Sequence, residues 1–144
     1  MIFKVALVVS EFNKEITDNL VMGAQQEYSK IFRLPLDNFD IYRIPGAFEL
    51  PGTIHKILKS NKKYHGIIAF GSIIKGDTAH FEYISNSVSS ALMELNIRDD
   101  INIPIMFGVL TTYNYEQALS RSKHIGNDIM KSTIDTIKVY EQIN

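Results

Sequence analysis

Residues 65–74 of this chain read HGIIAFGSII, a nearly continuous apolar run that is rich in isoleucine. Such a run is typical of a strand covered on both faces, whereas a strand with one exposed face alternates apolar and polar residues. Three other short apolar runs have the same character and are bounded by turn residues; they are residues 3–9, 39–44 and 103–110. The sequence therefore predicts four buried strands.

The segments that separate these runs have the apolar spacing of amphipathic helices. Apolar side chains recur on one helical face over residues 16–31, over residues 50–58 and, most clearly, over residues 81–95. A strand followed by a helix, repeated four times, predicts an α/β fold. We expect a single domain over residues 1–144, a flavodoxin-like three-layer α/β/α arrangement in which a four-stranded sheet is mostly parallel.

The last helical segment is predicted from Tyr115 to about Tyr140. Asn114 lies three residues before Gln117 and is expected to cap the start of this helix. Gly126-Asn127 interrupts the helical pattern, and we expect a kink or a short break there.

The composition limits the class of protein. A chain of 144 residues can bury one core. Its 15 lysines and arginines against 16 acidic residues leave a net charge of −1, which lacks the positive excess of a general nucleic-acid binder. No apolar run reaches the roughly 20 residues that span a bilayer, and residues 1–9 are interpreted as a buried strand rather than a signal peptide, so we expect a cytoplasmic protein. The absence of cysteine excludes disulfides and thiolate chemistry.

Ligands of open parallel sheets bind beyond the carboxyl ends of the strands. The segments to inspect are therefore residues 10–14, 45–51, 71–80 and 111–115. Residues 71–80 read GSIIKGDTAH and match a P-loop at two glycines and a threonine, but Asp77 stands where that loop needs lysine. A glycine-containing loop that ends at a helix amino terminus still favours an anion. Thr78 adds a hydroxyl donor there, and Asp77 is expected to serve through its backbone.

His80 follows this loop and is expected to open the next helix. Histidine is the side chain most often used for proton transfer near neutral pH, although a capping or surface role would also explain it. The other histidines, His55, His65 and His124, have no ligand spacing to one another, so no metal site is expected.

Aromatic and acidic residues follow two other predicted strands, and either a structural or a functional role would explain each of them. Phe12 could stack on a flat heterocycle or simply cover the core. Glu49 could face a ligand or be an ordinary acidic residue in a first helical turn. Phe107 is expected in the core of an isolated chain. Arg121 lies too far along its helix to reach its own sheet end, so we expect it on the surface or in a neighbouring subunit.

Together these segments resemble lumazine synthase, the family that makes 6,7-dimethyl-8-ribityllumazine, the precursor of riboflavin. The resemblance covers nearly the whole chain, because four motifs stand in the right order and spacing. They are Phe12-Asn13, residues 45–51, residues 71–88, and residues 107–112 leading through Glu116-Gln117-Ala118 to Arg121 and Gly126-Asn127.

The resemblance implies a transferase without a cofactor that condenses 5-amino-6-(D-ribitylamino)uracil with 3,4-dihydroxy-2-butanone 4-phosphate. It implies that His80 moves protons and that Asp77, Thr78 and Arg121 hold the phosphate. The residues implied to hold the ribitylaminouracil are Phe12, Ala47, Phe48, Glu49, Ser72, Ile73, Ile74 and Phe107. It also implies a homopentamer with sites shared between neighbours, which supply Phe107 and Arg121. Because the first sheet strand begins almost at Met1, we expect a free pentamer rather than the sixty-subunit shell of some relatives.

Three departures from the family pattern leave alternatives open. Glu11 replaces a common arginine, Asp128-Ile129 replaces Lys-Gly, and the preceding loop is one residue shorter, so that Lys123 would have to supply the missing positive charge.

A catalytically impaired homologue that binds a lumazine or flavin, or serves only in assembly, is one alternative. A flavodoxin-like signalling module is another, but the paired acids and late lysine of such modules are absent. A missing G-x-G-x-x-G disfavours an NAD enzyme.

Overall fold

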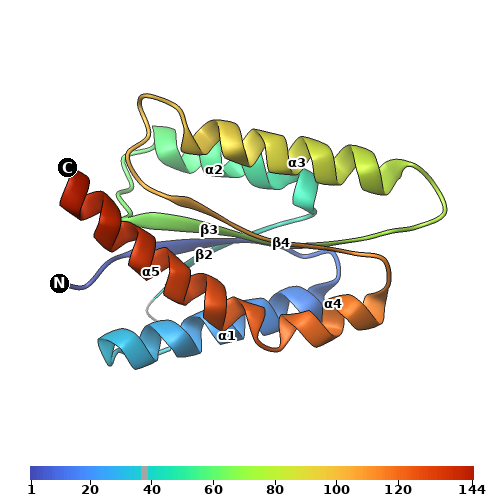
Figure 1. Ribbon diagram of the computed structural model, residues 1–144, viewed down its shortest axis with the longest axis horizontal. Helices are drawn as coiled ribbons and strands as arrows, with labels where there is room; N and C mark the ends of the chain where they lie inside the picture. Colours follow the sequence, from blue (N-terminus) through green and yellow to red (C-terminus); the bar gives the residue numbers. More distant parts are fainter. Residues whose placement is uncertain (37–38) are drawn as a thin grey trace.

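The computed structural model describes residues 1–36 and 39–144, and strands alternate with helices along them (Figure 1). In chain order the elements are β1 (Val5–Ser10), α1 (Lys14–Phe32), β2 (Asp40–Ile44), the short 3-10 helix η1 (Ala47–Glu49), α2 (Leu50–Lys59), β3 (Gly66–Ile74), α3 (His80–Asn96), β4 (Ile105–Thr112), α4 (Tyr115–Ser122) and α5 (Ile125–Ile143). Each predicted strand lies within two residues of an observed one, and each of the three apolar helical stripes lies on a helix.

The four strands form one sheet with the order β2-β1-β3-β4, and all three neighbouring pairs are parallel. The two central strands carry the densest apolar runs: every residue of β1 is buried, and every residue of β3 except Ile74. The edge strand β2 is only half-buried. Continuous apolar sequence thus marks the strands that helices cover on both faces.

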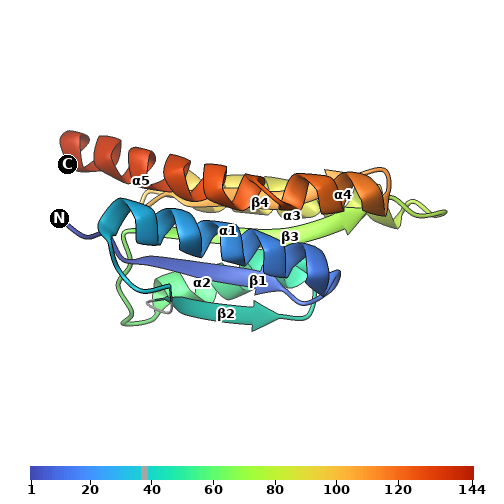
Figure 2. The ribbon, with the colours of Figure 1, turned by 90° about the horizontal axis from the view of Figure 1, so that it is seen from below.

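Helices α2 and α3 lie on one face of the sheet, and α1, α4 and α5 lie on the other (Figures 1 and 2). Alternate side chains of β1 serve the two cores: Leu7 and Val9 pack with α1 and α5, whereas Ala6 and Val8 pack with α2 and α3. The predicted three-layer α/β/α fold with a four-stranded parallel sheet is confirmed.

The last helical segment differs from its prediction. The break lies at Lys123-His124, between α4 and α5, and not at Gly126-Asn127. Gly126 instead belongs to the first turn of α5, where a Cβ atom would lie 2.2 Å from the backbone oxygen of Leu20 in α1. The glycine therefore permits close contact between two helices rather than a break in one. The predicted cap is confirmed, because the Asn114 side chain accepts a hydrogen bond from the Gln117 N–H at 2.9 Å.

Within the described ranges, no helix combines the length and apolar character that a membrane span requires.

Candidate active site

A pocket of about 290 Å³ lies at the carboxyl ends of β1 and β3, where it is bordered by η1 and the start of α3. Its lining residues are Phe12, Gly46, Ala47, Phe48, Glu49, Ser72, Ile73, Ile74, His80 and Ile84. These residues come from three separate segments of the sequence. Parallel strands bring the segments together because their carboxyl ends meet at the same edge of the sheet.

Phe12 lies in the loop between β1 and α1, and its side chain is 71% exposed. Two backbone hydrogen bonds tie this loop to the end of β2. The Glu11 N–H donates to the Ile44 oxygen at 2.7 Å, and the Phe12 N–H donates to the Pro45 oxygen at 3.0 Å. An exposed aromatic residue on a hydrogen-bonded backbone therefore lines the pocket, where a flat ligand could stack on it.

Glu49 has the position expected of an acidic residue in a first helical turn. Its Oε1 atom accepts a hydrogen bond from the Gly46 N–H at 2.9 Å. Pro51 follows in the first turn of α2. A backbone N–H in that turn has no partner within the helix, so proline, which lacks this N–H, is tolerated there. Glu49 thus closes the turn after β2 and lines the pocket as well, so the structural and functional readings are compatible.

His80 is the first residue of α3 and faces the pocket. The loop before it is held at both ends: the Lys75 N–H donates to the Thr112 oxygen at 2.9 Å, and Lys75 Nζ lies 3.1 Å from Glu82 Oε1. The pKa of the Glu82 carboxyl lies below its ordinary value. The main cause is a hydrogen bond from the Glu82 backbone N–H, and the second is a hydrogen bond from Lys75. The loop leads into the amino terminus of α3, where the His80 N–H donates to Thr78 Oγ1 at 3.4 Å and the positive end of the helix dipole favours an anion.

Comparison with known proteins agrees with this geometry. Residues 2–141 match the model of the family described as 6,7-dimethyl-8-ribityllumazine synthase. The chain is also 40% identical, over 145 residues, to a protein of Limosilactobacillus reuteri (strain DSM 20016) named 6,7-dimethyl-8-ribityllumazine synthase, and the match covers 98% of this chain and 91% of that relative. The chain belongs to the 6,7-dimethyl-8-ribityllumazine synthase family.

Most residues that the lumazine synthase resemblance implied for the site line the one pocket; they are Phe12, Ala47, Phe48, Glu49, Ser72, Ile73, Ile74 and His80. Ile84 was not among them, because its place in an apolar helical stripe indicated core. It lies four residues after His80 and thus on the same face of α3, a spacing that could have identified it.

The remaining implied residues lie outside the pocket of a single chain. Asp77 and Thr78 are exposed on the loop before α3, and Arg121 is exposed on α4. The expectation that Phe107 is a core residue of an isolated chain is wrong, because it is 46% exposed. It lies on the edge strand β4, where a hollow lined by Met93 and other residues of α3 remains beside it.

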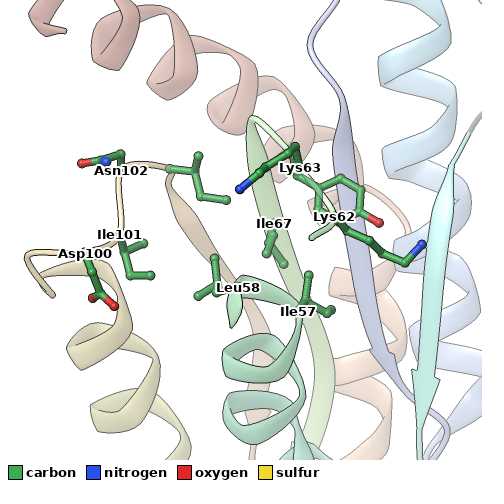
Figure 3. A pocket seen from close by; sticks show the side chains of 10 residues that line it. Ile57, Leu58, Lys62, Lys63, Ile67, Asp100, Ile101 and Asn102 are labelled. Atoms are coloured by element: carbon green, nitrogen blue, oxygen red, sulfur yellow. The ribbon is translucent and has the colours of Figure 1, made fainter. Parts of the chain in front are cut away.

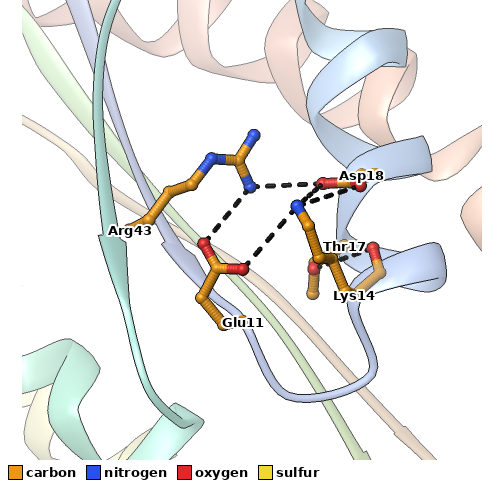
Figure 4. A network of polar contacts seen from close by, with 5 residues as sticks. All are labelled: Glu11, Lys14, Thr17, Asp18 and Arg43. Atoms are coloured by element: carbon orange, nitrogen blue, oxygen red, sulfur yellow. Dashed lines mark hydrogen bonds and ion pairs between the residues drawn. The ribbon is translucent and has the colours of Figure 1, made fainter.

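Glu11, a departure from the lumazine synthase pattern, takes part in a polar network beside the Phe12 loop (Figure 4). Its carboxylate lies 3.6 Å from Lys14 Nζ and 3.8 Å from Arg43 Nη1, and Asp18 joins both cations at 3.2 Å. These side chains are more than one-third exposed, so solvent screens them and each pair contributes little to stability. Glu11 is thus accommodated without facing the pocket.

Another hollow, of about 150 Å³, lies at the opposite end of the sheet, between the end of α2 and the segment before β4 (Figure 3). Ile57, Ile67 and Ile101 line its interior, and Lys62 and Lys63 stand at its edge. It adjoins the amino ends of the strands, whereas ligands of open parallel sheets bind at the carboxyl ends. The candidate active site is therefore the pocket beside His80.

Among the described residues, no group of three or more histidine and acidic side chains is placed to hold a metal ion.

Within the described part of the chain, two buried hydroxyls, those of Ser10 and Ser72, have no hydrogen-bond partner. An unpaired buried hydroxyl is destabilising, so Ser10→Ala is expected to raise the free energy of unfolding by about 1 kcal/mol. Urea titration measures this change. Tyr28→Phe is the control, because it removes a buried hydroxyl that donates to the Phe3 oxygen at 2.8 Å and should lower stability. A Ser10→Ala protein less stable than wild type would contradict the prediction.

Proposed function

We propose that the chain condenses 5-amino-6-(D-ribitylamino)uracil with 3,4-dihydroxy-2-butanone 4-phosphate to give 6,7-dimethyl-8-ribityllumazine, the penultimate step of riboflavin biosynthesis. The observation that carries this proposal is the pocket itself. In a member of the lumazine synthase family, motifs that are far apart in sequence meet around one cavity that is lined by exposed aromatic residues and by His80.

One side of the pocket suits a flat heterocycle with a polar chain. Phe12 and Phe48 are 71% and 61% exposed and both line the pocket, so a flat ligand bound there would cover them. We propose that Phe12 stacks on the pyrimidine ring. Ala47, Phe48 and Glu49, together with Ser72, Ile73 and Ile74, then hold the ring and the ribityl chain.

The other side suits a phosphate. We propose that Asp77 and Thr78 contact it through the loop and the amino terminus of α3, because backbone N–H groups at a helix start bind anions. Arg121 would pair with the same phosphate from a neighbouring subunit, and Phe107 of that neighbour would line the ribityl site. We propose that His80, at the first position of α3, lies between the two substrates.

The reaction needs orientation and proton transfer. The 5-amino group attacks the ketone carbon to form a carbinolamine, which loses water to give an imine. Elimination of phosphate follows, and the carbonyl formed as a result is attacked by the ribitylamino nitrogen with loss of a second water. Holding the two substrates together supplies much of the rate enhancement. His80 moves the protons that these additions and eliminations require.

We further propose a homopentamer in the cytoplasm, free rather than built into a sixty-subunit shell. Large apolar side chains are exposed on α3 and around β4: Tyr83 at 73%, Met93 at 60%, Phe107 at 46% and Tyr113 at 71%. Exposed apolar surface of this kind is typical of a subunit interface. Light scattering measures the mass directly, and a particle of shell mass would contradict the free pentamer.

The proposed reaction is tested by mixing purified protein with both substrates and following the lumazine chromophore together with phosphate release. Product with stoichiometric phosphate supports the proposal. No product from a folded, oligomeric protein would contradict it and would favour the alternative of an impaired homologue that binds lumazines or flavins.

Arg121→Ala is expected to raise the KM for the butanone phosphate by about 10- to 100-fold. The net loss of one hydrogen bond to a charged group costs about 1.5–3 kcal/mol, which corresponds to a change of this size. The KM for the ribitylaminouracil should change little. Lys123→Ala, in the turn after the same helix, shows in parallel whether that lysine shares the phosphate. Unchanged kinetics for Arg121→Ala would remove it from the site.

A further inference from the structure

Asn13 has an unusual backbone conformation directly beside the pocket. Its φ is 60° and its ψ is 51°, in the left-handed region that residues with a Cβ rarely adopt. Within the described ranges Arg33, at the other end of α1, is the one other non-glycine residue with positive φ. A residue stays in such a conformation only where the surrounding structure holds it there, and such residues cluster at functional sites.

The contacts of Asn13 join two walls of the pocket. Its side-chain Nδ2 donates to the backbone oxygen of Ser72 at 3.2 Å, at the end of β3 and 59 residues away in sequence. Its own backbone oxygen accepts from the N–H groups of Ile16 and Thr17, at 3.0 and 3.2 Å, and so begins α1. Asn13 thus connects the β1–α1 loop to the strand end that supplies the pocket wall.

The neighbour of Asn13 in sequence is Phe12, which has few contacts of its own because its side chain is largely exposed. The direction of its ring therefore depends on the backbone on either side. On one side the Phe12 N–H is bonded to the Pro45 oxygen, and on the other Asn13 turns the chain and is anchored to Ser72. We propose that Asn13 is a positioning residue that holds the Phe12 ring over the pocket and thereby sets the affinity for the heterocyclic substrate. This inference rests on the proposed function.

The effect should be confined to one substrate. The loop proposed to bind phosphate is anchored independently, through the Lys75 N–H to the Thr112 oxygen and through Lys75 to Glu82. Asn13 makes neither of these contacts. Loss of its anchor should therefore weaken binding of the ribitylaminouracil and leave binding of the butanone phosphate as it is.

Three variants separate the conformation of Asn13 from its hydrogen bond. Asn13→Gly keeps the left-handed conformation and removes the amide. Asn13→Asp also tolerates that conformation, but an ionised carboxylate cannot donate to the Ser72 oxygen. Asn13→Ala loses both. Because one hydrogen bond is worth about 1 kcal/mol, the glycine and aspartate variants should raise the KM for the ribitylaminouracil about fivefold, and the alanine variant should raise it further.

Arg33→Gly is the matched control. It relieves the same left-handed conformation at the far end of the same helix, so it should leave both KM values within about twofold of wild type. In a Phe12→Ala background, Asn13→Gly should have no further effect on binding, because the ring that it positions is gone. Additive losses in that double variant would overturn the proposal.

Calorimetric binding of the ribitylaminouracil alone distinguishes this inference from the proposed function, since it needs no turnover. If wild type neither binds nor converts the substrate, the proposed function fails and this inference fails with it. If wild type is active and Asn13→Gly raises both KM values equally, or neither, only the positioning role is overturned. A thermal unfolding midpoint for each variant shows whether the alanine protein folds, and the glycine protein carries the test if it does not.

Discussion

Replacement of His80 by alanine is expected to lower kcat by about 10²- to 10⁴-fold without abolishing turnover. His80 lies at the exposed start of α3 and lines the pocket, so its loss removes the proposed proton carrier and leaves the other pocket walls in place. The residual rate comes from holding two substrates in contact, which the variant still does. Both KM values should therefore change much less than kcat. Steady-state kinetics with each substrate varied in turn measures the two effects.

His55→Ala is the control for this experiment, because His55 is exposed on α2 and does not line the pocket. Its kinetics should match wild type. Unchanged kcat in His80→Ala would remove the histidine from the mechanism. A rise in both KM values at constant kcat would instead give it a binding role.

Gly126→Ala is expected to lower the free energy of unfolding by about 2 kcal/mol. A Cβ atom at this position would lie 2.2 Å from the backbone oxygen of Leu20, and backbone cannot rotate away as a side chain can. Alanine gains about 1 kcal/mol over glycine in a helix, whereas overpacking costs typically about 1–3 kcal/mol, and a 2.2 Å approach to backbone falls at the upper end of that range. The steric cost is therefore larger, and α1 and α5 must separate to accommodate the methyl group.

Gly52→Ala provides the opposite expectation under the same conditions. Gly52 lies in the first turn of α2, and a Cβ atom there would meet nothing within 4 Å. This variant should gain about 0.5–1 kcal/mol from helix propensity alone. Urea titrations of both variants at one protein concentration measure the difference. Equal free energies of unfolding for the two variants would contradict the prediction, because α5 would then shift to accommodate the added methyl group at little cost.

The sheet and most of the pocket could be predicted from local sequence. The continuous apolar run of β3 indicates a strand buried on both faces, and the 81–95 stripe indicates one covering helix. Once the strands are parallel, residues that follow them must meet at one edge of the sheet. This is why Phe12, residues 45–51 and His80 could be expected near one another before any coordinates were known.

Contacts across the fold could not be predicted in the same way. Gly126 reads locally as a helix breaker, yet it lies within α5, because the residue that requires its small size is Leu20 on another helix. The bond from Asn13 to the Ser72 oxygen has no local signal, since it depends on how the β1–α1 loop passes the end of β3. Phe107 is apolar and lies in a strand, but the sheet order makes β4 an edge and leaves its ring half exposed.

Periodicity, turn residues and strand polarity are properties of neighbouring residues. They were sufficient to predict the layers of this protein and the edge of the sheet where its candidate site lies. Three other features depend on groups that are distant in sequence. They are the close contact between two helices, the left-handed residue beside the pocket and the exposure of the edge strand. Packing at near-crystalline density determines those features, because each atom must fit neighbours that only the folded chain brings near.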